Sequence, residues 1–212
     1  MDRRLDGFAA VLFDLDGVLT DTASIHSDCW KSMFDDFLRE RAEGLGEAFV
    51  EFDIAGDYHQ YVDGKPRYDG VRSFLASRGI KLPDGDPSDP PGSDSVCALG
   101  NRKNELVNEV LRRDGVTPYP GSMRLLDELA AAGVRMAVVS SSKNAPTVLA
   151  AAGISERFET VVDGAVAAAA GLPGKPAPDT FLAAAEKLAV EHSEAVVVED
   201  AISGVEAGRN GD

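Results

Sequence analysis

Two aspartates separated by one residue stand directly after a short apolar run near the start of the chain. Residues 9–13 read Ala-Ala-Val-Leu-Phe, and Asp14 and Asp16 follow, with Gly17 behind them. The run predicts a buried parallel strand, and ligands gather beyond the carboxyl ends of such strands. Neighbouring carboxylates repel each other, and a bound cation or a retained proton would reduce this repulsion. Either condition suits phosphoryl transfer, with one carboxylate as the nucleophile and the other as the acid and base. The alternative is a strand that ends in a polar turn.

Three further polar groups follow apolar runs in the second half of the chain. Ser140 ends one run, where a hydroxyl and a helix start could bind an anion. Lys175 lies in a loop with a proline on either side, and Glu199 and Asp200 end another run. Each has an alternative interpretation when it is considered alone: Ser140 as a helix cap, Lys175 as a solvated charge, and Glu199 with Asp200 as a polar turn. Together with the aspartate pair they suit metal-assisted phosphoryl transfer to a carboxylate, and ligands that are all oxygen favour Mg²⁺.

Parallel strands are needed to bring these groups to one sheet edge. The second half of the chain has the alternation of apolar strand patterns and helix patterns that such a sheet requires. The predicted strands there are 134–139, 159–162 and 195–198, and the predicted helices are 122–132, 144–152, 178–190 and 202–209. Alternation of strands and helices predicts an α/β fold, a Rossmann-like parallel sheet core with helices on both faces.

A helical segment interrupts this pattern after the first strand. Apolar residues at helical spacing predict helices over 24–41, 45–54, 69–79 and 96–114, with no strand pattern among them. Residues 83–94 form an acidic loop rich in proline and glycine. We therefore expect a discontinuous core of residues 1–20 and 118–212 and an inserted α-helical cap of residues 21–117, which is well placed to act as a lid.

The composition limits the partners of the chain. Its 212 residues carry a formal net charge of −15 and are 44% hydrophobic. Such a charge repels nucleic acid and anionic membranes, so we expect no partner of either kind. No apolar stretch reaches the ~20 residues of a membrane span, and the start lacks the apolar run of a signal peptide, which predicts a cytoplasmic protein. Cys29 and Cys97 stand far apart in the sequence, and we expect both to be reduced. A phosphate site in this chain must be locally basic or neutralised by a metal.

The motifs and their order resemble the haloacid dehalogenase superfamily. Its four motifs are matched across essentially the whole chain by Asp14-Leu-Asp16-Gly-Val-Leu-Thr-Asp, then Ser140, then Lys175-Pro, and then Glu199-Asp200. The helical insert lies where that superfamily's first type of cap belongs. Four segments resemble its β-phosphoglucomutase-like branch: the linker from Thr20 to His26, Gly64-Lys-Pro-Arg67, Arg102-Lys103-Asn104, and Ser140-Ser-Ser-Lys143-Asn144.

The resemblance implies a role for each core residue. Asp14 would attack phosphorus and become an aspartyl phosphate, while Asp16 would protonate the leaving oxygen and deprotonate the incoming one. The residues implied to bind the transferring phosphoryl group are Ser140, Ser141 and Lys175. The implied ligands of Mg²⁺ are Asp14, the backbone carbonyl of Asp16, Glu199 and Asp200.

The resemblance also implies substrate contacts. Thr22 and His26 lie at the hinge into the cap and would tie the position of Asp16 to cap closure. Lys103 would face the sugar, and the non-transferring phosphate would be bound by Arg67, Ser142, Lys143 and Asn144. The implied reaction converts β-D-glucose 1-phosphate to glucose 6-phosphate through a bisphosphate. We expect a monomer whose partner is a small phosphorylated sugar.

Three other functions stay open. A sugar-phosphate phosphatase would use the same core residues, with water in place of the sugar. Carbon-halide cleavage also uses an aspartate nucleophile, but it needs no acid or base at Asp16. A non-catalytic regulatory or binding protein could keep the fold, although no nucleophile or metal ligand is lost here. Relatives with this motif order usually continue through another strand and helix beyond residue 212, which leaves open a truncated sequence or an incomplete sheet edge.

Overall fold

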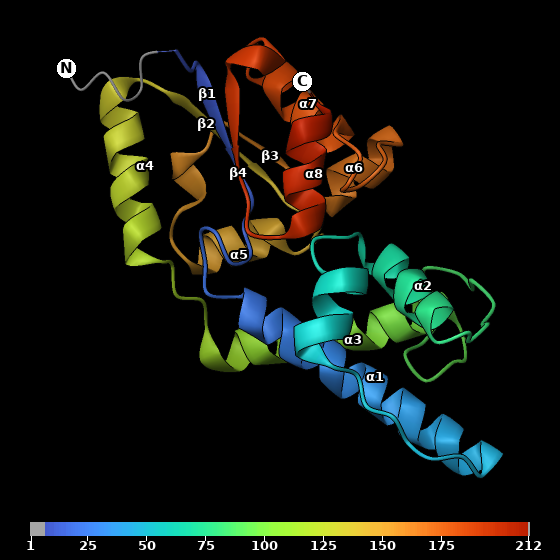
Figure 1. Cartoon of the computed structure of the whole chain (residues 1–212). Helices are drawn as coiled ribbons and strands as arrows, with labels where there is room; N and C mark the ends of the chain where they lie inside the picture. The colour runs from blue at the N-terminus through green and yellow to red at the C-terminus, as the bar shows by residue number, and fades with distance from the viewer. Residues whose placement is uncertain (1–6, 212) are drawn as a thin grey trace. The chain divides into compact units, whose positions relative to one another are not determined.

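The contacts within the chain divide it into two compact units. The computed structural model, drawn in Figure 1, describes residues 7–211. The core unit holds residues 7–22, Gly64–Pro66 and 115–211, and the insert unit holds Ala23–Asp63 and Arg67–Asp114. The tripeptide Gly64–Pro66 therefore belongs to the core unit by its contacts, although the insert surrounds it in sequence. The division into domains at residues 20 and 118 stays a prediction.

The core unit is built on a parallel sheet with the strand order β3-β2-β1-β4. Its strands are β1 (Ala10–Phe13), β2 (Arg135–Val139), β3 (Thr160–Val162) and β4 (Ala195–Val198). Phe13 lies opposite Val138 of β2 and Val198 of β4, so β1 and β4 end at the same level and β2 ends one residue further on. All side chains of β1 are buried, as the unbroken apolar run predicts for a central parallel strand. The predicted α/β fold is confirmed.

Helices cover both faces of this sheet, and Figure 1 shows α4 on one side with α7 and α8 on the other. The helices of the core unit are α4 (Pro120–Ala132), α5 (Ala145–Ala151), α6 (Gly164–Ala170), α7 (Asp179–Lys187) and α8 (Ile202–Asn210). Ala10 and Leu12 of β1 share one buried cluster with Phe181 and Leu188. Alternate β1 residues thus face α7, and the side chains between them face the opposite layer.

The sequence patterns did not predict α6. Its residues are mostly alanine, so no apolar stripe marks one face. The signals that could have found it lie at its ends. The Asp163 side chain accepts hydrogen bonds from the amides of Ala165 (2.9 Å) and Val166 (2.8 Å), and Gly171 ends the helix with a φ of 65°.

The insert unit is helical and packs around aromatic rings. Its elements are α1 (Ala23–Leu45), the π-helix Ile54–Val62, α2 (Arg67–Ser77) and α3 (Val96–Asp114). The ring centroid of Phe34 lies 4.2 Å from that of Phe74 and 5.1 Å from that of Phe52, and all three side chains are fully buried. As predicted, the described residues of the insert contain no strand. None of the helices between residues 7 and 211 is long and apolar enough to cross a membrane.

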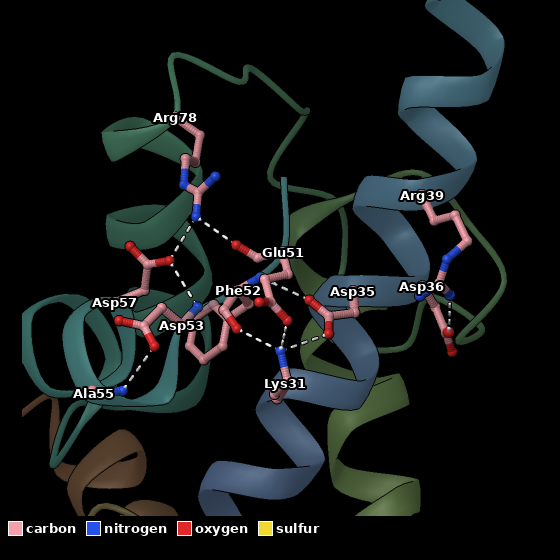
Figure 2. Close-up of polar contacts among 10 residues, drawn as sticks. All are labelled: Lys31, Asp35, Asp36, Arg39, Glu51, Phe52, Asp53, Ala55, Asp57 and Arg78. Carbon is pink, nitrogen blue, oxygen red and sulfur yellow. Dashed lines mark hydrogen bonds and ion pairs between the residues drawn. The ribbon is translucent and has the colours of Figure 1, made fainter. Parts of the chain in front are cut away.

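The predicted helix over residues 45–54 is wrong. Gly46 follows α1 with a φ of 68°, and the chain then runs without regular structure until the π-helix begins at Ile54. Figure 2 shows why this stretch is not helical: the Phe52 amide donates to Asp35 Oδ1 (2.7 Å), and the Phe52 carbonyl accepts from Lys31 Nζ (2.8 Å). Because side chains of α1 satisfy its backbone, Phe52 enters the aromatic core without helical hydrogen bonds.

Candidate active site

Predicted site residues directly follow three neighbouring strands. Asp14 is the first residue after β1, Ser140 the first after β2, and Glu199 the first after β4. Strand pairing continues into these positions, because the Asp14 amide donates to the Val198 carbonyl (2.9 Å) and the Ser140 amide to the Val162 carbonyl (3.0 Å). These strand ends therefore bring the side chains that follow them to one edge of the sheet.

Lys175 connects these strand ends. Its Nζ donates to Asp14 Oδ1 (2.5 Å), to the Val139 carbonyl (3.1 Å) and to Glu199 Oε1. Burial by itself lowers the pKa of the Lys175 ammonium, but the carboxylates of Asp14 and Glu199 outweigh it, and the net effect is a raised pKa. Lys175 is therefore charged at neutral pH, although only 3% of the residue is exposed.

Asp14 is the buried carboxylate of the cluster. Burial raises the pKa of Asp14 to about 8, against the lowering effect of Lys175 and with further increases from Glu199 and Asp16. Ionising Asp14 beside Glu199 and Asp16 would therefore place more negative charge at this edge of the sheet than the Lys175 ammonium balances. A bound cation would remove this imbalance and leave Asp14 ionised.

The oxygen atoms needed to hold such a cation lie close together. Asp14, Glu199 and Asp200 each offer one carboxylate oxygen, and these oxygens all lie within 4.8 Å of one another. An all-oxygen donor set suits a hard divalent cation. The donor chemistry therefore fits the predicted metal site, while the contribution of the Asp16 carbonyl stays a prediction.

Local contacts fix the position of the Glu199 carboxylate. Glu199 Oε2 accepts from the amides of Asp200 and Ala201, both at 3.1 Å. A Cβ atom on Gly204 would lie 1.9 Å from Glu199 Oε1, so only glycine leaves room for this carboxylate against α8. We did not predict Gly204 as part of the site. Its signal in the sequence is a glycine inside a predicted helix, which often marks a close approach.

Asp16 is held by the segment that follows it. The Thr22 hydroxyl donates to Asp16 Oδ1, and the hydroxyls of Thr20 and Thr22 lie 2.9 Å apart. Both threonines are fully buried, and Thr20 also donates to the Leu15 carbonyl (3.2 Å). The predicted pair of Asp16 and Thr22 is thus in direct contact, and Thr20 is an additional member that sequence reasoning missed.

The predicted anion-binding segment after β2 is ordered by its own hydroxyls. Ser140 Oγ accepts from the Ser142 amide (3.1 Å), and Ser142 Oγ accepts from the Asn144 amide (3.1 Å). Ser141 differs, because its hydroxyl donates to the Gly64 carbonyl (2.7 Å). The phosphate contacts expected of these residues and of Lys143 stay predictions.

The predicted catalytic residue His26 and the predicted substrate residue Lys103 meet inside the insert unit. Lys103 Nζ lies 2.5 Å from His26 Nδ1 and 5.0 Å from the centroid of the Trp30 ring. An ammonium can only donate, so a charged Lys103 would require His26 Nδ1 to accept in this contact. Lys103 is 6% exposed, and its amino group is buried against a ring nitrogen and an aromatic face.

Arg67, the other predicted substrate residue of the insert unit, begins α2. Burial lowers the pKa of its guanidinium, with a smaller opposing effect from Tyr68 and Cys97. The central carbon of the guanidinium lies 5.3 Å from the centroid of the Tyr68 ring. The structure thus brings predicted residues together at the strand ends of the core unit, and in the insert unit it brings His26 to Lys103.

The chain belongs to the haloacid dehalogenase-like hydrolase family, whose model matches residues 8–212. Within this family it belongs to the β-phosphoglucomutase-like branch. It is 56% identical over 202 residues to a β-phosphoglucomutase of Mycobacterium tuberculosis, which covers 95% of this chain and 77% of the relative. It is also 32% identical over 206 residues to the fructose-1-phosphate phosphatase YqaB of Escherichia coli, which covers 95% of this chain and 92% of that protein.

Solved structures resemble the chain as well. The crystal structure of a β-phosphoglucomutase from Clostridium difficile matches with a TM-score of 0.74 and 25% sequence identity, covering 96% of this chain and 81% of that one. The family and branch that the sequence motifs predicted are therefore confirmed.

Proposed function

We propose that this chain acts as a β-phosphoglucomutase, which converts β-D-glucose 1-phosphate to glucose 6-phosphate through a bisphosphate intermediate. The observation that carries this proposal is the 56% identity over 202 residues with the mycobacterial β-phosphoglucomutase. The chemistry of the site agrees with it, because a buried aspartate, a lysine and an acidic cluster meet where phosphoryl transfer requires a nucleophile and balanced charge.

Asp14 is the proposed nucleophile. Its Oδ1 accepts from Lys175 Nζ at 2.5 Å, which leaves Oδ2 to attack phosphorus and form the aspartyl phosphate. The phosphoryl group then carries negative charge on its peripheral oxygens, and the Lys175 ammonium is at hand to stabilise it. Ser140 and Ser141 are proposed to complete the binding of this group, through a hydroxyl and through backbone amides.

Asp16 is the proposed acid and base. The hydroxyl of Thr22 donates to Asp16 Oδ1 and holds this carboxyl group, which would exchange a proton with the sugar oxygen. The acid form would protonate the departing oxygen, and the base form would deprotonate the hydroxyl that attacks next.

Mg²⁺ is the proposed cation of the acidic cluster. Asp14, Glu199 and Asp200 would hold it, together with the backbone carbonyl of Asp16. When bound, the ion supplies positive charge that offsets the charge of the transferring phosphoryl group.

Substrate binding is proposed for Arg67, Lys103, Ser142, Lys143 and Asn144. His26 is proposed as a catalytic residue that, with Thr22, ties the position of Asp16 to cap closure. Lys103→Ala tests the insert residues, since removal of a buried ammonium that binds the sugar phosphate should raise KM at least tenfold. Arg102→Ala is the matched control, because Arg102 is a neighbouring cation that donates instead to Asp36 Oδ2 (2.9 Å). Equal KM values for both variants would remove Lys103 from the proposed substrate site.

A phosphatase is the second candidate function. The 32% identity with the fructose-1-phosphate phosphatase of Escherichia coli favours it, and the same core residues would serve both reactions. The two differ in whether a sugar hydroxyl or water accepts the phosphoryl group, so exclusion of water decides between them.

One assay separates the two functions. The purified chain is given β-glucose 1-phosphate, Mg²⁺ and a trace of β-glucose 1,6-bisphosphate, and the formation of glucose 6-phosphate is compared with the release of inorganic phosphate. A mutase forms glucose 6-phosphate with little phosphate. Phosphate release alone would reject the mutase, and rates equal to those of Asp14→Asn for both products would support a non-catalytic protein.

A further inference from the structure

A tripeptide from the middle of the insert sequence packs against three loops of the core unit. Residues Gly64–Pro66 are grouped with the core unit by their contacts. The first contact is a hydrogen bond, in which the Ser141 hydroxyl donates to the Gly64 carbonyl at 2.7 Å. Ser141 directly follows Ser140, a proposed phosphate ligand, so this bond anchors the tripeptide to the loop after β2.

The second contact is with the loop that carries Lys175. A Cβ atom on Gly174 would lie 2.1 Å from Pro66 Cγ and 2.7 Å from Pro66 Cδ, so the Gly174 backbone lies directly against the proline ring. The φ angle of Gly174 is outside the left-handed region. The close packing of Pro66, and not the backbone conformation, is therefore what requires a glycine next to Lys175.

The third contact is with the loop after β4. A Cβ atom on Gly64 would lie 2.2 Å from Ser203 Oγ and 3.0 Å from Ala201 Cβ, and Gly64 has a φ of 70°. Ala201 directly follows Asp200, a proposed metal ligand. In each of the three loops, the residue next to a proposed site residue contacts the tripeptide.

From this pattern we propose that Gly64, Pro66, Ser141 and Gly174 are positioning residues for phosphoryl transfer. The seated tripeptide keeps the loops of Ser140, Lys175 and Asp200 at the spacing that the phosphoryl group and the cation require. This inference rests on the proposed function in so far as those three residues bind phosphate and metal. Small displacements of such groups have large kinetic effects, since an error of about 1 Å in placement can cost roughly 100-fold in rate.

Gly174→Ala is the sharpest test, because the new methyl group would occupy the position of the Pro66 ring. We expect kcat to fall about 10- to 100-fold, with a smaller change in KM, since the loss is one of positioning in the transition state. Pro66→Ala in the same chain removes Cγ and Cδ and leaves Cβ at 3.6 Å from the new methyl group, which is an ordinary contact. The double variant should therefore recover most of the lost rate.

Gly121→Ala is the matched control, because the nearest atom to its new methyl group is Arg124 Nη2 at 3.9 Å. Hydrogen exchange at the amides of Gly64 and Lys65 gives a readout that is independent of the substrate. Exchange should become faster in Gly174→Ala, stay as in the wild type in Gly121→Ala, and slow again in the double variant.

Two results would overturn the inference. One is a Gly174→Ala chain with wild-type kinetics and wild-type exchange, and the other is a double variant that stays as slow as the single one. A wild-type chain that releases only inorganic phosphate overturns the mutase assignment and leaves this test intact, because the same variants are then compared by phosphate release.

Discussion

Lys31 and Lys175 each bind two carboxylates, yet their surroundings differ. Lys31 lies 2.9 Å from Asp35 and 2.7 Å from Glu51 at the surface of the insert unit (Figure 2), where its side chain is 32% exposed. The hydrogen bonds from Glu51 and Asp35 raise the pKa of Lys31. Exposed ion pairs of this kind contribute about 0–1 kcal/mol to stability. This cluster anchors the irregular segment that carries Phe52.

Lys175 lies between Asp14 and Glu199, and its side chain is 1% exposed. Here burial acts against the charged form of Lys175 and raises the pKa of Asp14 to about 8. A lysine with two carboxylates therefore forms an exposed ion-pair cluster in the insert unit and a buried one in the core unit. The comparison shows that burial, more than the choice of residues, creates a site where charge is strong enough for phosphoryl transfer.

The largest expected difference between the Lys175 and Lys31 clusters is in turnover, when one carboxylate of each cluster is replaced by an amide. Asp14→Asn should lower turnover by about 10⁴-fold or more, because the amide cannot form the aspartyl phosphate. Asp35→Asn makes the same substitution beside Lys31 and should leave turnover unchanged. Steady-state kinetics measure both variants, and circular dichroism checks that Asp14→Asn is folded. Substantial turnover of Asp14→Asn at normal Mg²⁺ would refute the mechanism.

The second expected difference is in the free energy of unfolding, when the lysine of each cluster is removed. Lys175→Ala leaves buried carboxylates without their cation and should lower the free energy of unfolding by about 3–5 kcal/mol in the absence of metal. Lys31→Ala should lower it by about 1 kcal/mol. Urea unfolding in a chelating buffer measures both. Equal losses for the two variants would show that the difference in burial has no energetic consequence.

Cation binding should be confined to the cluster around Lys175. Mg²⁺ at about 100 times its dissociation constant should stabilise the wild type by about 2.7 kcal/mol, and EDTA should remove both this gain and the turnover. Asp200→Asn should lose most of the gain, while Glu51→Gln, beside Lys31, should keep it. Thermal unfolding with and without Mg²⁺ decides this, and an undiminished gain in Asp200→Asn would place the cation elsewhere.

The smallest effect is expected for the hydroxyl that holds Asp16. Thr22→Val keeps the shape of the side chain but removes the donor, and it should lower kcat about 10- to 100-fold with little change in KM. Thr160→Val, at the β3 edge of the sheet, is the matched control and should have wild-type kinetics. A Thr22→Val enzyme with wild-type kcat would show that Asp16 needs no support from this hydroxyl.

Much of the core and its site could be predicted because the signals are local. An apolar run that ends in Asp14 marks both a buried strand and its functional end, and the same holds for the run before Glu199. Helix ends marked by proline and glycine, as at Pro146 and Gly133, were equally predictable. The monomeric state, the cytoplasmic location and the absence of nucleic acid and membrane partners stay predictions.

Two features of the fold were not predicted from the apolar pattern, for different reasons. The segment before Phe52 reads as a helix by its pattern, but side chains of α1 bind its backbone instead. The missed helix α6 has no apolar stripe, so only its cap residues mark it. The apolar pattern thus failed at residues 45–54 because hydrogen bonds to side chains 17 and 21 positions away replace helical ones, and it failed at α6 because the helix has no apolar face to mark it.

The sequence by itself determined the order of the strands and helices in the chain, the polar groups that end the strands, and the family to which these motifs belong, because each depends on near neighbours in the chain. Only the tertiary structure decided which lysine is buried among carboxylates and which tripeptide of the insert packs on the core loops. Lys175 and Asp14 are 161 residues apart, and Ser141 and Gly64 are 77 apart. Contacts over such separations depend on how the whole chain packs, and no local pattern encodes them.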